Sequence, residues 1–325
     1  MAVPRPARRG AGTARTVRRG SGSVPPGRGG TVTRSPVGLV GLGVMGSAMS
    51  THLLAAGFPV LGFDLDAGRC VQHAERGGVV CDSPSEVAQG ADVVVTSLPS
   101  AGALLAVLDG ERGLGAAARP GLVVIETSTL SPETKQDAHD RALAFGATVL
   151  DCPMSGTGQQ ARDGDLVAYL SGDPAAKEKA LPVLAAFTRA QHDLGAFGRG
   201  TTMKLVANLL VAVHNAAAAE ALLLAQRAGL DLGTVLAAVG DGAGGSRMLQ
   251  VRGPLMAAGQ YADATATVAT MQKDNALIAA FAASVASPTP LFSASAVLYQ
   301  AAVAQDRLTE DTACVFGVLQ RLAGQ

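Results

Sequence analysis

Lys204 and Asn208 stand four residues apart in an otherwise apolar segment. In a helix the two side chains lie on one face. The three residues between them are apolar, and a partly desolvated ammonium has a lowered pKa. Such a lysine can donate a proton to a substrate oxygen and accept one from it. The alternative is a solvated lysine at the exposed start of a helix.

A second candidate for chemistry is the segment DCPMSGTGQQARDG, residues 151–164, which directly follows an apolar run. Ser155, Gly156 and Thr157 form its centre. Glycines beside small polar residues do not build a core, but they let the backbone come very close to something small. The alternative role for Ser155 is to cap a turn.

Strand-like and helix-like segments alternate through the first half of the chain and would position these candidates. Apolar strands are predicted within residues 36–43, 58–66, 91–99, 121–129 and 147–153, with a short apolar run at 78–81. Helix-like segments lie between these strands, and the first of them ends at Gly57. This alternation predicts a doubly wound, mainly parallel sheet that is covered on both faces.

The first strand-to-helix turn has the spacing G-x-G-x-x-G. Gly41, Gly43 and Gly46 supply the glycines, and Val44 and Met45 lie between the last two. The turn follows a strand and opens a helix, which is the context that gives this motif its meaning. Glycines allow the backbone to approach a pyrophosphate, and the helix N-terminus favours its charge. The sequence therefore predicts a Rossmann domain that binds a dinucleotide; the alternative is an ordinary tight turn.

Asp64 lies at the end of the second predicted strand, roughly 20 residues after Gly41, where a carboxylate accepts hydrogen bonds from the cofactor ribose. It would repel the additional phosphate of NADP. The nearest arginine is Arg69. The sequence therefore favours NAD and leaves NADP as a second option. Asp66 is the alternative ribose ligand, or a helix cap.

The second half of the chain is predicted to be entirely helical. A long helix over about residues 201–228 would span roughly 40 Å and join the two domains. Further helix-like segments lie at 232–240, 264–287, 292–304 and 311–324. Such Ala-rich helices cannot all bury their apolar faces in one small domain, which predicts a homodimer or homotetramer. The predicted organisation is a tail at 1–35, a Rossmann domain at 36–198 and a helical domain at 199–325.

The tail differs sharply from the rest of the chain. It holds eight arginines and no acidic residue, so the remaining residues carry a net charge of −8. A nucleic-acid partner for the acidic body is therefore not expected, and only the tail could provide one. The tail is predicted to be disordered. It is interpreted as an inert extension, a basic arm for an anionic partner, or an organelle transit peptide.

Four cysteines and five histidines show no disulfide framework and no metal-ligand spacing. Scattered free thiols fit a reducing compartment, and the tail lacks the apolar centre of a secretory signal. We therefore expect a cytoplasmic protein without a bound metal. The apolar run from Leu205 contains Asn208, His214, Asn215 and Glu220, which favours a buried helix over a membrane span.

Five motifs, taken in order, resemble the beta-hydroxyacid dehydrogenases, the family of 3-hydroxyisobutyrate dehydrogenase and tartronate semialdehyde reductase. They are GLGVMGSAMSTHLLAAGF, ETSTLSPET, DCPMSGTGQQARDG, GRGTTMKLVANLL and MQKDNALIAA. The resemblance covers about residues 36–322. It implies hydride transfer between NAD(P) and the alcohol or aldehyde carbon of a small 3-hydroxy acid.

The resemblance also implies a role for each matching residue of the substrate site. Lys204 matches the catalytic lysine that exchanges a proton with the substrate oxygen. Asn208 matches the amide that holds this lysine and the substrate. Ser155, Gly156 and Thr157 match the loop that grips the substrate carboxylate, for which backbone N–H groups and a hydroxyl are well suited.

On the cofactor side, the resemblance implies that Thr129 and the Leu98–Pro99 turn contact the nicotinamide half. Lys273 matches a lysine of the second domain that closes over cofactor and substrate, with Asp274 supporting its helix. Thr129 could instead be a strand-end hydroxyl or part of a helix cap. Lys273 and Asp274 could instead form a solvated helix face.

Three positions depart from the common family loop, in which alanine, valine and glycine stand where this chain has Cys152, Met154 and Thr157. Substrate choice is therefore the property least safely carried over. Cys152 is interpreted as a small buried residue, with thiol sensitivity as the alternative. Two further functions remain open: an imine reductase-like enzyme and a non-catalytic nucleotide-binding interaction protein.

Overall fold

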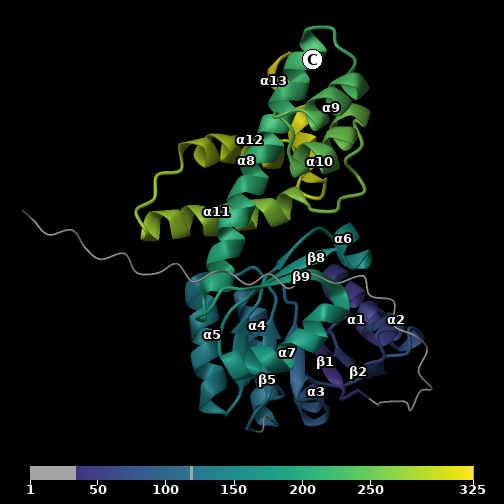
Figure 1. Ribbon diagram of the computed structural model, residues 1–325, viewed down its shortest axis with the longest axis vertical. Coiled ribbons are helices and arrows are strands. Elements are labelled where there is room, and N and C mark those ends of the chain that lie inside the picture. The colour runs from purple at the N-terminus through teal and green to yellow at the C-terminus, as the bar shows by residue number, and fades with distance from the viewer. Residues whose placement is uncertain (1–33, 118–119, 325) are drawn as a thin grey trace, which may run out of the picture.

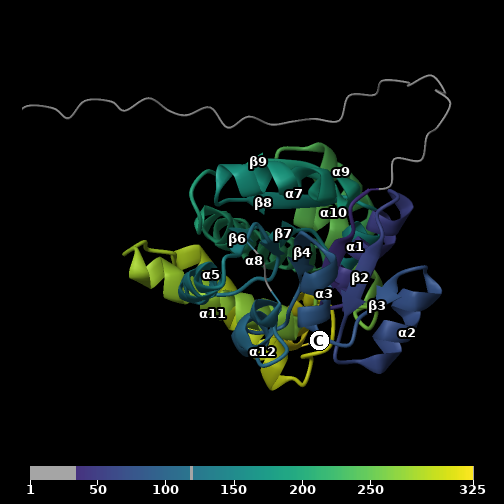
Figure 2. The ribbon, with the colours of Figure 1, turned by 90° about the horizontal axis from the view of Figure 1, so that it is seen from below.

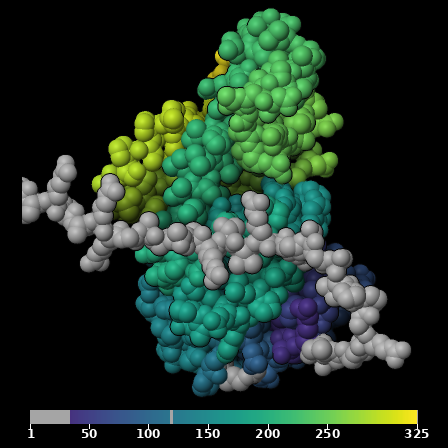
Figure 3. Space-filling view, in the orientation of Figure 1, coloured from purple at the N-terminus to yellow at the C-terminus, as the bar shows by residue number. Residues whose placement is uncertain are grey.

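The computed structural model describes residues 34–117 and 120–324. An α/β half carries a helical half on top of it, and one long helix runs from the first half into the second (Figure 1). In the space-filling view the helical half, green to yellow, rises from the purple-to-teal α/β half (Figure 3). The predicted tail lies outside the described residues, except for its last two.

A six-stranded parallel sheet forms the centre of the α/β half. Its strands are β1 (Val37–Val40), β2 (Val60–Phe63), β3 (Val79–Val80), β4 (Val93–Thr96), β5 (Val123–Glu126) and β6 (Thr148–Asp151). Their order is β3-β2-β1-β4-β5-β6, and every described pairing is parallel. Valine-rich runs form these strands because they are buried on both faces. The order is that of the Rossmann fold, so the predicted fold class is confirmed.

Helices cover both faces of this sheet (Figure 2). One core joins the sheet to α1 and α7, and the other joins it to α3, α4 and α5. The helices of this half are α1 (Val44–Ala55), α2 (Ala67–Glu75), α3 (Pro84–Gly90), α4 (Ala101–Asp109), α5 (Pro132–Ala144) and α7 (Pro174–Phe187). Serine side chains cap the N-termini of α3, α4 and α5, and aspartates cap α2 and α7.

A small second sheet lies between the two halves, and the sequence did not predict it. It consists of β7 (Met154–Ser155), β8 (Leu166–Leu170) and β9 (Thr188–Asp193) in that order. The segment 151–164, which the sequence indicated to be one loop, contains strand β7 and a short helix, α6 (Gly158–Arg162). Local pattern could not reveal a two-residue strand, because β7 exists only through its pairing with β8.

The helical half is built around α8 (Arg199–Arg227). The other helices of this half are α9 (Leu232–Asp241), α10 (Arg247–Ala258), α11 (Val268–Ser284), α12 (Pro290–Ala304) and α13 (Val315–Leu322). The sequence did not predict α10, whose interior contains Gly253 and Pro254. A Cβ at this glycine would lie 2.3 Å from a methyl carbon of Leu236, so α9 and α10 pack closely at this point.

Helix α8 is long and apolar enough, by length and composition, to cross a membrane. Its buried residues include Leu205, Ala212, Ala219 and Leu222, and they pack in one core with residues of α10 to α13. Asn215 lies inside this core and donates hydrogen bonds to the Tyr299 hydroxyl and the Thr312 carbonyl. The helix is therefore the centre of a bundle, as predicted.

Candidate active site

A cavity of about 1200 Å³ lies between the two halves. It is lined by the start of α1, by the loops after β4, β5 and β7, by one face of α8, and by the residues that lead into α11. Predicted site residues from both halves meet here: Val44, Met45, Leu98, Pro99, Thr129, Ser155, Gly156, Thr157, Lys204, Asn208 and Lys273. Segments far apart in the sequence thus form one site.

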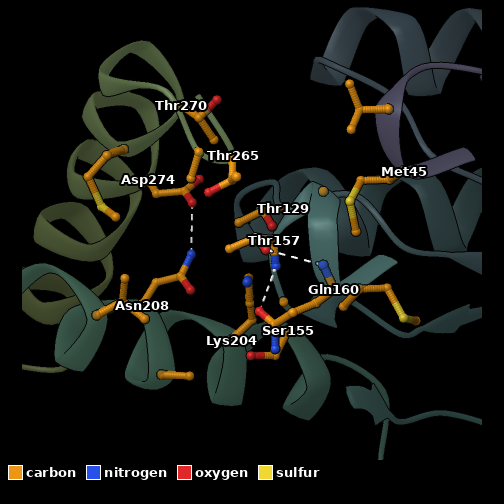
Figure 4. Close-up of a pocket in the computed structure, with 18 of the residues that line it drawn as sticks. Met45, Thr129, Ser155, Thr157, Gln160, Lys204, Asn208, Thr265, Thr270 and Asp274 are labelled. Atoms are coloured by element: carbon orange, nitrogen blue, oxygen red, sulfur yellow. Dashed lines mark hydrogen bonds between the residues drawn. The ribbon is translucent and has the colours of Figure 1, made fainter. Parts of the chain in front are cut away.

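Lys204 projects from the second turn of α8 into this cavity, beside Ser155 and Asn208 (Figure 4). Its side chain is buried, at 9% exposure, so it is not a solvated lysine at a helix start. Burial lowers the pKa of Lys204, the nearby Asp274 carboxylate raises it, and the Lys273 ammonium lowers it. A lysine with a lowered pKa exchanges protons near neutral pH more readily than a solvated one.

Asn208 is held by a carboxylate from the opposite side of the cavity. Its Nδ2 donates to Asp274 Oδ2 at 2.7 Å, and the Lys273 ammonium lies 2.9 Å from Asp274 Oδ1. Lys273 also donates to the Thr129 carbonyl at 2.6 Å, which links the helical half to the loop after β5. Asp274 is therefore not part of a solvated face. It is a site residue to which sequence reasoning gave only a supporting role.

The loop after β7 begins as an extended strand and turns sharply at Gly156, whose φ is +147°. Thr157 caps α6: its hydroxyl accepts from Gln160 N at 3.3 Å, while its own N–H donates to Gln160 Oε1 at 3.0 Å. That N–H group is therefore occupied, and Ser155 and Thr157 line the cavity (Figure 4). Gln160 also lines the cavity, and only a capping-box pattern could have indicated it.

Cys152 lies directly beneath this loop and is fully buried. Burial, together with the neighbouring Asp151 carboxylate, raises the pKa of its thiol well above the ordinary value. Because the thiolate is the reactive form, the structure supports the interpretation of Cys152 as a buried filler rather than a reactive thiol.

The glycine-rich turn has the shape that a pyrophosphate requires. Gly41 has a φ of +95°, and a Cβ there would lie 2.2 Å from the Ser97 carbonyl oxygen. At Gly46 a Cβ would lie 1.8 Å from the Gly41 carbonyl oxygen, so the turn and α1 are in backbone contact. A Cβ at Gly43 would point into open space, with only the Arg69 side chain within 4 Å of it. The residues present therefore fit a dinucleotide at this edge of the sheet.

Asp64 is well placed to bind the cofactor ribose. Its carboxylate accepts the N–H groups of Leu42 at 2.7 Å and of Asp66 at 2.9 Å, which holds it against the glycine-rich turn. Asp66 caps the N-terminus of α2, which is the alternative role that the sequence gave it. The Arg69 guanidinium lies 3.4 Å from Asp64 Oδ2. The sequence argument for NAD had treated this arginine as too far along the chain to stand next to Asp64. A carboxylate and a cation thus lie together at the position where the sequence predicts the ribose.

The Asp274→Asn variant tests the electrostatics of the site. Asparagine can still accept the hydrogen bond from Asn208, but it lacks the charge that raises the Lys204 pKa. With the role that the sequence predicts for Lys204, oxidation of an alcohol would require its neutral amine, so the rate would rise with pH through the pKa of Lys204. The rising limb of kcat/KM should therefore move to lower pH, by roughly one unit. Asp263→Asn, at an exposed carboxylate, serves as the control, and a limb that stays in place would contradict this account.

Comparison with known proteins identifies the family. Residues 36–198 match the model described as the NAD binding domain of 6-phosphogluconate dehydrogenase. Residues 198–319 match the one described as the NAD-binding part of NADP-dependent 3-hydroxyisobutyrate dehydrogenase. L-threonate dehydrogenase of Cupriavidus necator is 35% identical over 87% of this chain and 95% of its own length.

Solved structures agree with this assignment. The crystal structure of 3-hydroxyisobutyrate dehydrogenase from Salmonella typhimurium has a TM-score of 0.80 and 31% identity, over 88% of this chain and 100% of its own. A structure described as Psf3 in complex with NADP+ and 2-OPP has a TM-score of 0.79 and 25% identity, over 87% and 99%. An imine reductase from a Pseudomonas species, at 18% identity, shares the fold alone. The chain belongs to the beta-hydroxyacid dehydrogenase family and is an NAD(P)-dependent oxidoreductase that acts on the CH–OH group of hydroxy acids.

Proposed function

We propose that this protein interconverts a small 3-hydroxy acid and its aldehyde, with Lys204 as the general acid and base. The observation that carries the proposal is the position of Lys204. Its side chain is buried in the cavity between Ser155 and Asn208 (Figure 4), and its pKa is lowered. The described part of the chain offers its ammonium no hydrogen-bond partner, which leaves it available to a substrate oxygen.

The surrounding residues hold the substrate for this proton transfer. In oxidation, neutral Lys204 accepts the hydroxyl proton; in reduction, its ammonium donates a proton to the carbonyl oxygen. Asn208 is fixed by Asp274, so its amide oxygen can orient Lys204 or the substrate hydroxyl. The Ser155 hydroxyl donates a hydrogen bond to the substrate carboxylate. When bound, NAD(P) supplies the hydride chemistry at the neighbouring carbon.

The charge of the cavity supports an anionic substrate. The body of the chain is acidic, yet the cations that line the cavity outnumber its anions. The cationic lining residues are Lys204, Lys273, Arg189, Arg247 and Arg252, and the anionic ones are Asp165 and Asp274. Such a site attracts a carboxylate and the cofactor phosphates. Because an L-threonate dehydrogenase is 35% identical to this chain, threonate belongs beside 3-hydroxyisobutyrate and glycerate among the first substrates to test.

The test is a measurement of NAD(H) and NADP(H) absorbance with a panel of 3-hydroxy acids and semialdehydes. Turnover of one panel member would support the proposal and name the substrate. Cofactor binding without turnover of any hydroxy acid or semialdehyde, together with turnover of a cyclic imine, would contradict it.

For the cofactor we propose that NAD is preferred and that NADP is accepted. Asp64 repels a 2′-phosphate, whereas the half-exposed Arg69 can turn toward it. We expect Asp64→Asn to shift the ratio of kcat/KM values toward NADP by about tenfold, or about 1.4 kcal/mol. Arg69→Ala should remove the remaining activity with NADP and leave that with NAD. Equal losses with both cofactors in the Arg69 variant would contradict the assignment.

We further propose that the protein is a cytoplasmic homodimer or homotetramer whose contacts lie in the helical half. Large apolar side chains are exposed there: Leu224, Leu291, Val297 and Leu322. Light scattering during gel filtration measures the oligomer size. Nucleic-acid binding is proposed only for the basic tail, and a full-length chain that binds no more tightly than one lacking residues 1–35 would exclude it.

A further inference from the structure

Three charged side chains lie buried at the carboxyl ends of β5 and β6, and the proposed proton transfer uses none of them. Glu126 and Asp151 end these neighbouring strands and are register partners. Lys135 of α5 forms an ion pair with Glu126, and its Nζ lies 3.3 Å from Asp151 Oδ1. All three side chains are completely shielded from solvent. We call them the buried charge cluster.

One side of the cluster holds the start of the helix that carries Lys204. Asp151 accepts hydrogen bonds from both the N–H and the hydroxyl of Thr201, each at 2.7 Å. Thr201 lies in the first turn of α8, one turn before Lys204, and a carboxylate at a helix N-terminus is favourable. The contact is close, because a Cβ at Gly200 would lie 2.6 Å from the Asp151 carbonyl oxygen.

The other side of the cluster holds the loops that line the cofactor side of the cavity. Glu126 Oε1 accepts from the N–H of Ser128 at 3.0 Å and from the Thr96 hydroxyl at 3.4 Å. The Ser128 hydroxyl in turn accepts from the N–H of Leu98 at 2.8 Å. Glu126 therefore fixes the Leu98–Pro99 turn and the segment that leads to Thr129.

We propose that Lys135 is a positioning residue: by holding Glu126 and Asp151 side by side, it sets the place of Lys204 relative to the cofactor loops. The inference rests on the proposed function, because that function gives Lys204 the proton transfer. Lys135 itself touches neither substrate nor cofactor. It does not line the cavity; its ammonium contacts the two carboxylates and donates to the Glu126 carbonyl oxygen at 3.3 Å.

The proposal predicts an unusual pH dependence when the cation is removed. In Lys135→Met, two adjacent buried carboxylates would share one proton at low pH and repel each other once both ionise. The Cys152 thiol, whose pKa burial raises, lies beside the cluster, and His139 stands one turn after Lys135 on α5. The hydroxyls of Thr96, Ser171 and Thr201 complete the surroundings of the cluster. Activity of the variant should therefore fall as pH rises, whereas oxidation by the unmodified protein rises.

The experiment compares Lys135→Met with the matched double variant Lys135→Met/Glu126→Gln in the full chain. The unmodified cluster holds one cation and two anions, a net charge of −1. In the double variant only the Asp151 anion remains, so the net charge is the same. The new amide oxygen could still accept the hydrogen bond from the Ser128 N–H. Steady-state kinetics and NADH fluorescence titrations would run from about pH 6 to pH 10, with melting temperatures recorded in parallel. Lys179→Met, at an exposed lysine, is the surface control.

We expect kcat of the single variant to approach that of the unmodified protein at the acid end and to fall about tenfold to a hundredfold below it at the alkaline end. The dissociation constant of NADH should rise with pH in the same variant. The double variant should regain the kcat and the pH profile of the unmodified protein. A purely structural role would lower the melting temperature of the single variant without inverting its pH profile, and that result would overturn the proposal.

Two further outcomes are decisive. If the single variant does not fold, a double variant with unmodified kcat supports the proposal, and one that folds normally but loses kcat overturns it. If the unmodified protein turns over no hydroxy acid, the proposed function fails. The cluster is then judged by the NADH titration alone, in which a pH-independent dissociation constant of the single variant overturns the inference.

Discussion

Replacing Lys204 with alanine is expected to lower kcat by about 10²- to 10⁴-fold, the usual contribution of a general acid or base. The dissociation constant of the cofactor should stay unchanged, because the motif glycines and Asp64, which hold the glycine-rich turn, are not part of the cavity lining around Lys204. The stability of the variant should be equal or higher. Lys204 is buried without a carboxylate directly paired to it, and removing a desolvated charge relieves a cost of folding.

Stopped-flow and steady-state rates measure the loss, and a thermal melt measures the stability. Lys179→Ala is the matched control, since Lys179 is exposed and far from the cavity lining. A Lys204→Ala protein that keeps more than about a tenth of kcat would exclude the proposed proton transfer. A loss of activity that comes with a lower melting temperature would assign Lys204 to folding instead.

Gly43→Ala is expected to weaken cofactor binding by at least about tenfold while the protein stays as stable as before. A Cβ at Gly43 meets only the Arg69 guanidinium, at 3.8 Å, and the backbone there already has a φ of −64°, which alanine adopts easily. The methyl group therefore fits the protein. It occupies instead the surface that a pyrophosphate must approach. Fluorescence titration with NADH measures the effect.

Substitutions at two other glycines are the controls for Gly43→Ala. Gly46→Ala should lose stability as well as cofactor affinity, because its Cβ would collide with the Gly41 carbonyl at 1.8 Å. Gly102→Ala, in open space on α4, should raise the melting temperature, since alanine favours helix by about 1 kcal/mol. Unchanged NADH affinity in Gly43→Ala would place the pyrophosphate elsewhere.

Much of the α/β half could be predicted because its signals are local. Each buried parallel strand is a run of apolar residues, and most of its helices have a serine or aspartate cap directly before them. The spacing of Gly41, Gly43 and Gly46 and the place of Asp64 follow from the same local pattern. Lys204 and Asn208 could be paired because helical periodicity alone puts them on one face.

The remaining features depend on contacts between distant segments. Strand β7 exists through its pairing with β8, and α10 forms although its interior contains Gly253 and Pro254, with Leu236 of α9 packed against Gly253. Asp274 becomes part of the site only when α11 approaches α8. Lys135 gives no sequence signal, since a lysine in a polar helix reads as solvated until the fold buries it between two strand ends.

The long helix α8 leaves the α/β half at Gly198, whose φ is +86°. Its first turn is bound to that half, because Asp151 accepts two hydrogen bonds from Thr201. A rotation of the helical half by about 5° about this bound end would displace the far end of α8, roughly 40 Å away, by about 3.5 Å, and Lys204, about 8 Å away, by less than about 1 Å. The amine of Lys204 therefore stands where a relative motion of the two halves would displace it least.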